Sequence, residues 1–403
     1  MALLSGKNQR VPWFARRFSS IFAVLMLALA GLVSIPCLGS TVVAWGAGTM
    51  DVTNSADDDF GQSIIPAHLT NAVMIASGYS KSFALKSDGT ILGWGDDILA
   101  GLGFYNDFPA GSNYESIACG MFHSLALNMD GTVTAVGDDT HAQTEVPANL
   151  SNVVAVACGW YNCLVLKSDG TLSAWGAAGN VDYGQGTVPN NLSNVEAISS
   201  GAYYDIALKS DGTVFAWGEN DVGETDVPAN LSNVVAIAAG GYHGLALKSN
   251  GTVVAWGEDE NGQTNVPFNL SNVVAIAAGT WHSLALKSNG TVVAWGYDGD
   301  GETNVPSNLT NVIQIAAGQQ NSLAIVGSGP PTVHALLSQP KFGTNGFSVS
   351  LPTQNGRVYQ LIYKNSLMNG PWQSLPLNAG TGSSLILTDP AIASQRFYEA
   401  QRW

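Results

Sequence analysis

Positive charge is almost absent from the long middle of this 403-residue chain. Residues 41–332 contain six lysines, no arginine and 28 Asp and Glu residues, and the whole chain carries a formal net charge of −15. Such a surface repels a phosphate backbone, so the composition argues against nucleic acid as a partner of this region. With 11% charged residues and 46 glycines, the composition indicates a folded, turn-rich, β-leaning chain rather than a disordered one.

Motifs that carry catalytic or cofactor chemistry are also missing. The sequence has no Ser-His-Asp spacing, no phosphate-binding loop and no His-Glu-x-x-His. Its four cysteines form no Cys-x-x-Cys pair and no Cys/His ligand spacing. We therefore predict a protein that is not an enzyme and that requires neither a cofactor nor a metal ion.

A long hydrophobic run occurs only near the N-terminus. Four basic residues precede the apolar run Ile21 to Ile35, which is 15 residues long. This length suits the hydrophobic region of a signal peptide and is short for a membrane span of about 20 residues. We predict a signal peptide over residues 1–40, an extracellular or periplasmic location, and no membrane span after its removal. An uncleaved membrane anchor is the alternative.

The most abundant feature of the sequence is a repeat of about 40 residues. A Trp-Gly pair recurs with steps of 49, 42, 39, 42, 39 and 39 residues, at Trp45, Trp94, Val136 (a substituted copy), Trp175, Trp217, Trp256 and Trp295. A second motif, Ile-Ala-Ala-Gly or a close variant, keeps this period, with its glycine at Gly78, Gly120, Gly159, Gly201, Gly240, Gly279 and Gly318. Strand-like repeats of this length are typical of β-propellers.

Each repeat contains three short apolar runs separated by turn residues. In the repeat over residues 273–296, Asn289-Gly290 lies between the second and third runs and is a strong signal for a two-residue hairpin. The spacer over residues 263–267 can supply a fourth, outer strand, with Pro267 at an edge where no ladder donor is needed.

The two ends of the repeat array complement each other. Residues 41–46 provide a third strand without the first two, whereas residues 312–325 provide the first two strands without a third. We therefore predict an all-β chain with a seven-bladed β-propeller over residues 41–327, closed by the N-terminal strand, because ring closure removes open sheet edges. Residues 328–332 are predicted to be a linker, and the alternating runs that follow predict a small C-terminal β-sandwich over residues 333–403.

The repeat motif resembles a known family. A glycine, two variable residues, His-Ser-Leu-Ala-Leu, a hairpin and Trp-Gly, as in Gly279 to Gly296, are similar to the regulator of chromosome condensation repeat. The resemblance covers about residues 41–327, and the spacer Gly262 to Pro267 is most similar to secreted bacterial members, such as propeller-type β-lactamase inhibitory proteins. It implies a seven-bladed propeller with a binding role. Nuclear relatives with guanine-nucleotide exchange activity are a poorer match, because the predicted signal peptide exports this chain.

Following the strands through one repeat assigns residues to the two faces of the disc. Residues after the repeat glycine and residues after Trp-Gly turn at the same end of each blade, so they share a face, and Lys86, Lys167, Lys209, Lys248 and Lys287 lie on the other. The aromatic members of the first face are Phe122, Trp160, Tyr161, Tyr203, Tyr242 and Trp281. Its predicted acidic binding residues are Glu219, Asp221, Asp259, Glu260, Asp298 and Asp300, and further acids in the same position are Asp96, Asp97, Asp138, Asp139 and Glu258.

Aromatic anchors surrounded by charge concentrate binding energy at protein interfaces, and acidic surroundings speed the encounter with a basic partner. We predict a secreted, non-enzymatic propeller that binds a protein partner, of basic character, through this aromatic and acidic face. The alternative is a cell-surface polysaccharide-binding propeller, in which exposed rings stack on sugars. Against both stand the purely structural interpretations, in which the rings wedge between blades and the acids are solvated turn residues.

Two further repeat positions contain residues with possible chemical roles. His123, His243 and His282 share one position, but they lie in different blades, so we predict structural hydrogen bonds to neighbouring backbone rather than a metal site. Cys119 and Cys158 share another position that is Ser or Ala in other repeats. They are either small buried residues or a disulfide between neighbouring blades.

Overall fold

The computed structural model describes residues 40–48, 60–95, 108–111, 113–327, 338–343, 346–352, 358–364, 373–379, 384–389 and 397–402. Residues 1–39 of the predicted signal peptide and the predicted linker over residues 328–332 lie outside this part. The described residues form strands and turns, and they include no helix that is long and apolar enough to cross a bilayer.

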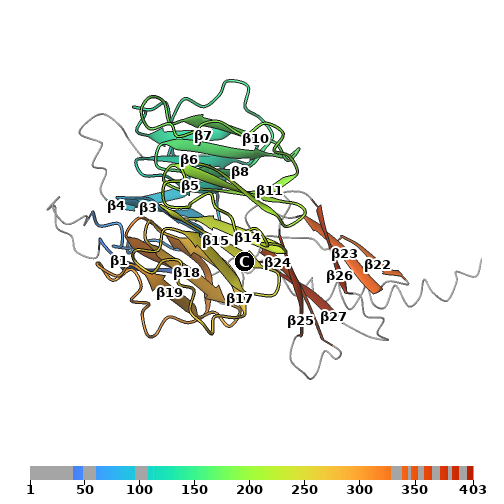
Figure 1. The fold of residues 1–403 in the computed structure, drawn as a ribbon. Coiled ribbons are helices and arrows are strands. Elements are labelled where there is room, and N and C mark those ends of the chain that lie inside the picture. Colours follow the sequence, from blue (N-terminus) through green and yellow to red (C-terminus); the bar gives the residue numbers. More distant parts are fainter. Residues whose placement is uncertain are drawn as a thin grey trace, which may run out of the picture.

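Strands β1 to β21 form seven three-stranded antiparallel sheets, which are the blades of a β-propeller (Figure 1). Blade 1 contains β2 (Ala72–Ser77), β3 (Lys81–Lys86) and β4 (Ile91–Gly95). Blade 2 contains β5 (Tyr114–Cys119), β6 (His123–Asn128) and β7 (Val133–Gly137), and blade 3 contains β8 (Val153–Cys158), β9 (Asn162–Lys167) and β10 (Leu172–Gly176). Blade 4 contains β11 (Val195–Ser200), β12 (Tyr204–Lys209) and β13 (Val214–Gly218). The predicted all-β, seven-bladed fold is confirmed.

The remaining blades follow the same pattern. Blade 5 contains β14 (Val234–Ala239), β15 (His243–Lys248) and β16 (Val253–Gly257), and blade 6 contains β17 (Val273–Ala278), β18 (His282–Lys287) and β19 (Val292–Gly296). Blade 7 combines β20 (Val312–Ala317) and β21 (Asn321–Val326) with β1 (Thr41–Gly46). β1 pairs antiparallel with β21, so the third strand of this blade comes from a segment remote in sequence.

The same turn joins the second and third strands of most blades. In blade 6 the side-chain Oδ1 of Asn289 accepts hydrogen bonds from the backbone N–H and the hydroxyl of Thr291, at 3.1 and 2.7 Å. Gly290 between them has φ of 78°, a left-handed conformation that glycine adopts without steric cost. Asp211 and Thr213 form the same pair of bonds in blade 4. The Asp-Gly and Asn-Gly pairs of the sequence therefore set the hairpins.

The hydrophobic core lies between neighbouring blades. Each middle strand, such as β12, is buried at five of its six positions. Ile206 and Leu208 of this strand pack with Val234, Ala246 and Trp256 of blade 5. Burying one large apolar side chain contributes about 1.5–3 kcal/mol, so each blade stabilises the next one in the ring.

In five of the seven blades the Trp-Gly tryptophan attaches the outer strand to the spacer that leads into that blade. The indole N–H of Trp256 donates to the backbone oxygen of Glu224 at 2.8 Å, and that of Trp295 donates to Gln263 at 2.9 Å. The indoles of Trp94 and Trp175 bind Gln62 and Gln143 in the same way, at 2.9 Å. These tryptophans are buried, so losing the bond would leave a desolvated donor.

The predicted fourth strand in the spacers is wrong. Within the described residues every propeller sheet has three strands. The hydrogen bonds of the spacer after blade 5 are local, with Asn265 N–H donating to Gly262 O at 3.1 Å and Leu270 N–H donating to Pro267 O at 2.9 Å. Val266 and Leu270 pack against the core instead of extending along a sheet edge. Turn geometry and apolar anchoring therefore prevail over strand pairing.

Two of the repeat histidines form structural hydrogen bonds as predicted, but the partners are serine side chains rather than backbone. Nε2 of His243 lies 2.9 Å from Ser283 Oγ, and Nε2 of His282 lies 3.0 Å from Ser322 Oγ, each across a blade boundary. Burial lowers the pKa of His243 to about 3 and that of His282 to about 4, so both rings are neutral near pH 7. His123 is likewise fully buried. No group of three metal-binding side chains occurs among the residues that the structure describes.

The cysteines of the propeller are free thiols. Cys158 and Cys163 are buried, and Cys119 is partly buried. Cys158 Sγ lies 3.5 Å from the backbone oxygen of Ala118 in blade 2, which it approaches as a weak donor. The structure thus gives these residues the small, buried character of the serines and alanines that replace them in other repeats.

Beyond the propeller, six strands form two three-stranded sheets. The first contains β22 (Ser338–Gly343), β23 (Gly346–Pro352) and β26 (Ser384–Asp389), and the second contains β24 (Val358–Lys364), β25 (Gln373–Ala379) and β27 (Phe397–Arg402). β25 lies against β14 of blade 5 (Figure 1). That the two sheets form a β-sandwich stays a prediction.

Replacing Trp45 tests how strongly β1 is integrated into blade 7. Its side chain is 5% exposed, and its indole N–H donates to Glu302 O at 2.7 Å. We expect Trp45→Ala to lower the free energy of unfolding by about 3–5 kcal/mol. Phe268→Ala, at a side chain that is 99% exposed, should change it by less than about 0.5 kcal/mol. Urea denaturation measures both values, and a loss below about 1 kcal/mol for Trp45→Ala would contradict an integral role for β1.

Asp205 is expected to make stability depend on pH. Asn162 Nδ2 lies 3.1 Å from each carboxylate oxygen of Asp205. Burial raises the pKa of Asp205 to about 7, above the value of about 3.9 for an exposed Asp. Protonated Asp205 therefore stabilises the fold fully below about pH 4, and this contribution is lost as the pH rises through about 7.

Asp205→Asn removes this titration. Relative to the wild type, the variant should gain stability between pH 5 and pH 7, by at most about 1.4 kcal/mol per pH unit. Urea denaturation at several pH values measures the difference. The control is Asp211→Asn, at an exposed turn position that is already Asn250 and Asn289 in blades 5 and 6. A stability difference for Asp205→Asn that did not change with pH would contradict the raised pKa.

Candidate functional site

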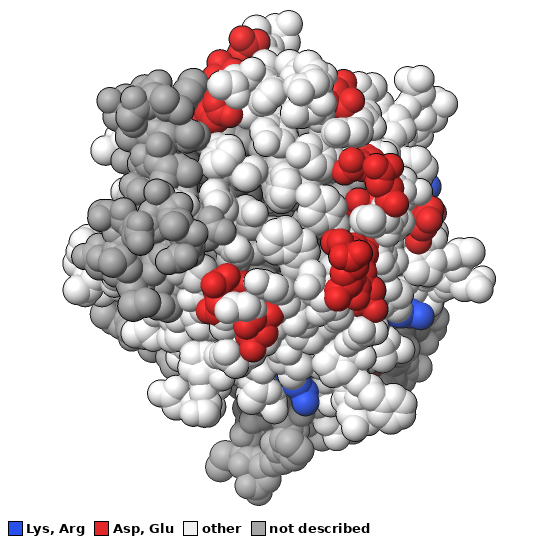
Figure 2. Space-filling view, turned by 60° about the vertical axis from the view of Figure 1, so that its left-hand side comes forward, with Lys and Arg blue, Asp and Glu red and all other residues white. Residues whose placement is uncertain are grey.

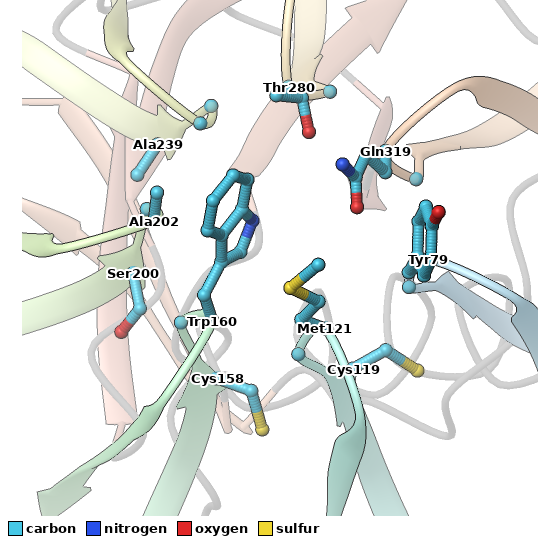
Figure 3. Close-up of a pocket in the computed structure, with 18 of the residues that line it drawn as sticks. Tyr79, Cys119, Met121, Cys158, Trp160, Ser200, Ala202, Ala239, Thr280 and Gln319 are labelled. Atoms are coloured by element: carbon cyan, nitrogen blue, oxygen red, sulfur yellow. The ribbon is translucent and has the colours of Figure 1, made fainter. Parts of the chain in front are cut away.

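The inner strands of all seven blades end around one hollow at the centre of the disc. The hollow measures about 500 Å³ when the space open to solvent is included. Every blade contributes the last residue of its inner strand, the repeat glycine and the residue after it (Figure 3). A Cβ atom on Gly201 would lie 2.6 Å from Gly240 O, so the blades approach too closely here for a side chain. This close approach explains the repeat glycine.

The residue after the repeat glycine differs from blade to blade. In ring order these residues are Tyr79, Met121, Trp160, Ala202, Gly241, Thr280 and Gln319. Ala202 and Gly241 are buried, and they belong to blades 4 and 5, the next two blades after that of Trp160. The indole of Trp160 extends toward the side of the hollow formed by Ala202 and Ala239 (Figure 3). The residues after the repeat glycine in blades 4 and 5 thus have the smallest side chains around the hollow, on the side where this indole lies.

Predicted aromatic and acidic residues lie side by side at one end of the blades. Backbone N–H groups of Glu219 and Glu258 donate to the carbonyls of Tyr203 and Tyr242, each at 3.0 Å. Asp138 N–H donates in the same way to Phe122 O, at 2.9 Å. The structure therefore places the residue after Trp-Gly next to the second residue after the repeat glycine.

The lysines lie at the opposite end of the blades. In blade 6, Lys287 pairs with Val273 at the start of the inner strand, whereas Ser283 pairs with Ala278 at its end. Figure 2 shows a face on which carboxylates surround an uncharged, hollowed centre and lysine or arginine is visible only at the margin. Negative charge on this face is therefore not neutralised by the repeat lysines.

Four of the six predicted aromatic residues form one cluster. The ring centroids of Trp160 and Tyr203 are 5.5 Å apart, those of Trp160 and Tyr242 are 5.7 Å apart, and Tyr161 stacks on Tyr203 at 5.8 Å. We call Trp160, Tyr161, Tyr203 and Tyr242 the aromatic cluster. All four are partly exposed, whereas the Trp-Gly tryptophans are buried.

The other two predicted aromatic residues have different neighbours. Phe122 contacts Tyr79, with ring centroids 5.7 Å apart, and Trp281 contacts Tyr297 at 6.0 Å. Both are partly exposed as well. They lie at the predicted end of their blades but in separate ring pairs.

Sequence reasoning missed two rings that extend the cluster. Tyr183 lies 5.1 Å from Tyr203, and His141 lies 5.0 Å from Tyr161, measured between ring centroids. A signal for Tyr183 was present, because the 42-residue step between Trp175 and Trp217 leaves room for an insertion. His141 lies in a spacer whose residues vary, so the repeat gave no signal for it.

The six predicted acidic residues have different roles. Asp259 and Asp298 close their own loops, because Oδ1 of each accepts a backbone N–H five residues later, from Thr264 and Thr303, at 3.0 Å. Asp221, Glu260 and Asp300 are exposed, and Glu219 is half-buried. Asp96 and Asp97 lie outside the described residues.

Three glutamates lie close enough to the aromatic cluster to affect its electrostatics. Burial, followed by the negative charges of Glu219, Glu258 and Glu224, raises the pKa of Tyr242 to about 12. Burial and neighbouring carboxylates also raise the pKa of Glu219 and of Glu258. The cluster is therefore a site where further negative charge is disfavoured and a positive charge would be favourable.

Comparison with known proteins identifies the class of the propeller. Four segments, residues 153–185, 195–224, 234–263 and 273–302, match the family model described as regulator of chromosome condensation (RCC1) repeat. Each match begins with the inner strand of a blade and ends at the buried Gln or Glu of the following spacer. Blades 3 to 6 of the propeller thus carry RCC1 repeats. Its likeness to secreted bacterial members stays a prediction.

Solved structures support the same fold. Prp20p from Saccharomyces cerevisiae is similar with a TM-score of 0.59 at 19% identity, covering 72% of this chain and 93% of that chain. Human WBSCR16 is similar with a TM-score of 0.54 at 19% identity, covering 72% of this chain and 99% of that chain. At these identities the likeness establishes the fold alone. No curated protein matches the chain.

The position of Trp160 should depend on the small residue beside it. Ala202→Leu fills the space that the indole occupies, so we expect the Trp160 indole N–H resonance to shift in ¹H–¹⁵N spectra, while the other tryptophan resonances stay in place. The resonance is assigned by its absence in Trp160→Phe. Ala229→Leu, at an exposed spacer position, is the control and should leave it unchanged. An unshifted Trp160 resonance in Ala202→Leu would contradict this packing.

Proposed function

We propose that this RCC1-repeat propeller is an exported, non-enzymatic protein that binds a partner protein through the aromatic cluster and the carboxylates around it. The observation that carries this proposal is a continuous group of partly exposed rings from three blades, next to glutamates. Protein interfaces draw most of their affinity from a few such aromatic anchors, enclosed by a polar rim. RCC1-repeat propellers with known partners support protein binding as a use of the fold.

Two solved structures of the yeast relative name such partners. Prp20p is described together with its binding properties to Gsp1p and histones, and yeast RCC1 (Prp20) has been solved bound to Kap60, in a structure with 21% identity and a TM-score of 0.56 that covers 72% of this chain and 90% of that chain. These partners belong to the yeast protein. For this chain they support protein binding as a use of the fold.

The charge of the face favours a basic partner. Its carboxylates surround the uncharged centre, and Glu219 and Glu258 form no ion pair within the described part of the chain (Figure 2). Opposite charge across an interface increases the association rate and excludes acidic competitors. Export is supported by the apolar run over residues 21–35, which a signal peptide explains. We propose an extracellular or periplasmic location on that basis.

A polysaccharide is the second candidate partner. Tyr161 and Tyr203 stack nearly parallel, with 24° between their planes, and Tyr183 is 51% exposed. Such rings present flat apolar surfaces on which sugars stack. Binding by stacking would respond weakly to salt, whereas charge-assisted protein binding weakens as salt rises.

The test is capture of partners from the native extracellular fraction with the immobilised full chain. We expect a basic protein to be retained at about 0.1 M salt and released at about 1 M, where the screening length falls from about 10 Å to about 3 Å. Trp160→Ala combined with Tyr242→Ala should abolish retention and leave the melting temperature within a few degrees of the wild type.

Trp281→Ala is the matched control, because Trp281 occupies the repeat position of Tyr242 outside the aromatic cluster. Retention of a polysaccharide that persists at about 1 M salt would instead favour the second candidate. Retention that survives the double substitution would place the binding surface elsewhere. A large loss of stability in the double variant would show that these rings are part of the core.

A further inference from the structure

At one point of the face, three rings of the aromatic cluster lie beside two glutamates. Tyr203 and Tyr242 both meet the indole of Trp160 edge to face, at 67° and 81° between ring planes. The residues bonded to these two tyrosines through the backbone are Glu219 and Glu258. One ring from each of blades 3, 4 and 5 thus lies near the carboxylates of Glu219 and Glu258.

Neither glutamate is neutralised within the described residues. The ion pairs Lys86–Asp88 and Lys209–Asp211 lie at the other end of the blades. Glu258 Oε2 accepts one hydrogen bond, from Gln263 Nε2 at 3.3 Å, and this bond brings no positive charge. The carboxylates therefore keep their charge and most of their hydrogen-bonding capacity for a group from outside the chain.

Aromatic rings and carboxylates attract the same kind of group. The face of an aromatic ring carries negative electrostatic potential, so a cation within about 6 Å of the ring centre is attracted to it. An anion would be repelled by both elements, and a neutral apolar group would leave the glutamates partly desolvated without a partner. Of the possible occupants, a cation alone is favoured by rings and acids together.

The guanidinium group fits this combination better than an ammonium group. It is planar and weakly hydrated, it stacks on aromatic faces, and its N–H groups can reach two carboxylates at once. An ammonium group is a compact and strongly hydrated charge, which loses more hydration against rings. The arrangement of two acids beside three rings therefore favours arginine over lysine.

We propose that the aromatic cluster receives an arginine side chain of the partner protein, with the guanidinium lying over the rings of Trp160, Tyr203 and Tyr242 and donating hydrogen bonds to Glu219 and Glu258. This inference rests on the proposed protein-binding function and names the group that the face recognises. Trp160 meets the tyrosines of blades 4 and 5 from the rim of the central hollow, which Ala202 and Gly241 also line.

The test uses two probes that differ in charge and hardly in shape, N-acetyl-argininamide and N-acetyl-citrullinamide. Each is titrated into the ¹⁵N-labelled full chain, and the indole N–H resonance of Trp160 is followed. We expect a saturable shift with the arginine probe and binding at least about tenfold weaker with the citrulline probe, because citrulline lacks the charge. N-acetyl-lysinamide should bind more weakly than the arginine probe.

Variants assign the effect to the proposed residues. Tyr242→Ala should abolish the shift caused by the arginine probe, and Glu219→Gln combined with Glu258→Gln should weaken its binding about tenfold while keeping the fold, since both changes preserve side-chain size. Trp281→Ala, at the equivalent position of blade 6, should leave the binding unchanged.

Each result decides the proposal without deciding the function. Equal binding of arginine and citrulline, equal or tighter binding of lysine, or no shift with the arginine probe at concentrations of tens of millimolar would overturn the arginine assignment. If partner capture still depended on Trp160 and Tyr242, the proposed function would stand in any of these cases. Conversely, a charge-selective probe response without a captured protein would support the cation site and contradict the partner-binding function.

Discussion

A hydrogen bond from a buried tryptophan to a spacer carbonyl, present in five of the seven blades, is the constraint on which those blades depend. Each propeller sheet has only three strands within the described residues, and this bond gives the outer strand a second attachment besides the sheet ladder. The indole of Trp295 supplies it by donating to Gln263 O, and Ser283 Oγ donates to the same oxygen, both at 2.9 Å. Because Ser283 also contacts His243 of blade 5, one carbonyl joins a spacer and two blades. The loop that follows Trp295-Gly296 on the aromatic and acidic face begins next to this bonded tryptophan.

Two substitutions at the boundaries between blades are accompanied by a matching change in the next blade. Where blade 3 has Asn162 instead of histidine, blade 4 has Asp205 instead of serine, and the amide donates to the carboxylate. Where blade 4 has Tyr204, its hydroxyl bonds to His243 O, and the facing residue is Gly244, at which a Cβ would collide with the ring of Trp256. Each pair satisfies the same requirement, which is a filled and hydrogen-bonded boundary between blades.

The repeat made the fold predictable and the site only partly so. Trp-Gly spacing, Asn-Gly turns and alternating burial recur, so every blade repeats the same local evidence, and face assignment follows from counting strands. The expected spacer strand failed because residues such as Val266 are apolar for packing, which strand-like composition does not distinguish from pairing. Which rings meet could not be predicted, since Trp160 and Tyr242 come from blades 3 and 5 and the repeat does not encode the direction of their side chains. Tyr183 contacts the aromatic cluster from an insertion, which the sequence shows only as a longer step between Trp175 and Trp217.

The insertion that contains Tyr183 lies where the regular repeat of the fold meets the aromatic cluster. The spacer after blade 3 is longer than those of blades 5 and 6, and it carries Tyr183 to the ring of Tyr203. Trp217, which this spacer precedes, has no hydrogen-bond partner for its buried Nε1 within the described residues, unlike Trp175 and Trp256. An unsatisfied buried donor costs about 1–3 kcal/mol. The spacer after blade 3 therefore departs from the regular repeat in two ways, because it adds a ring to the face and leaves Trp217 without its hydrogen bond within the described residues.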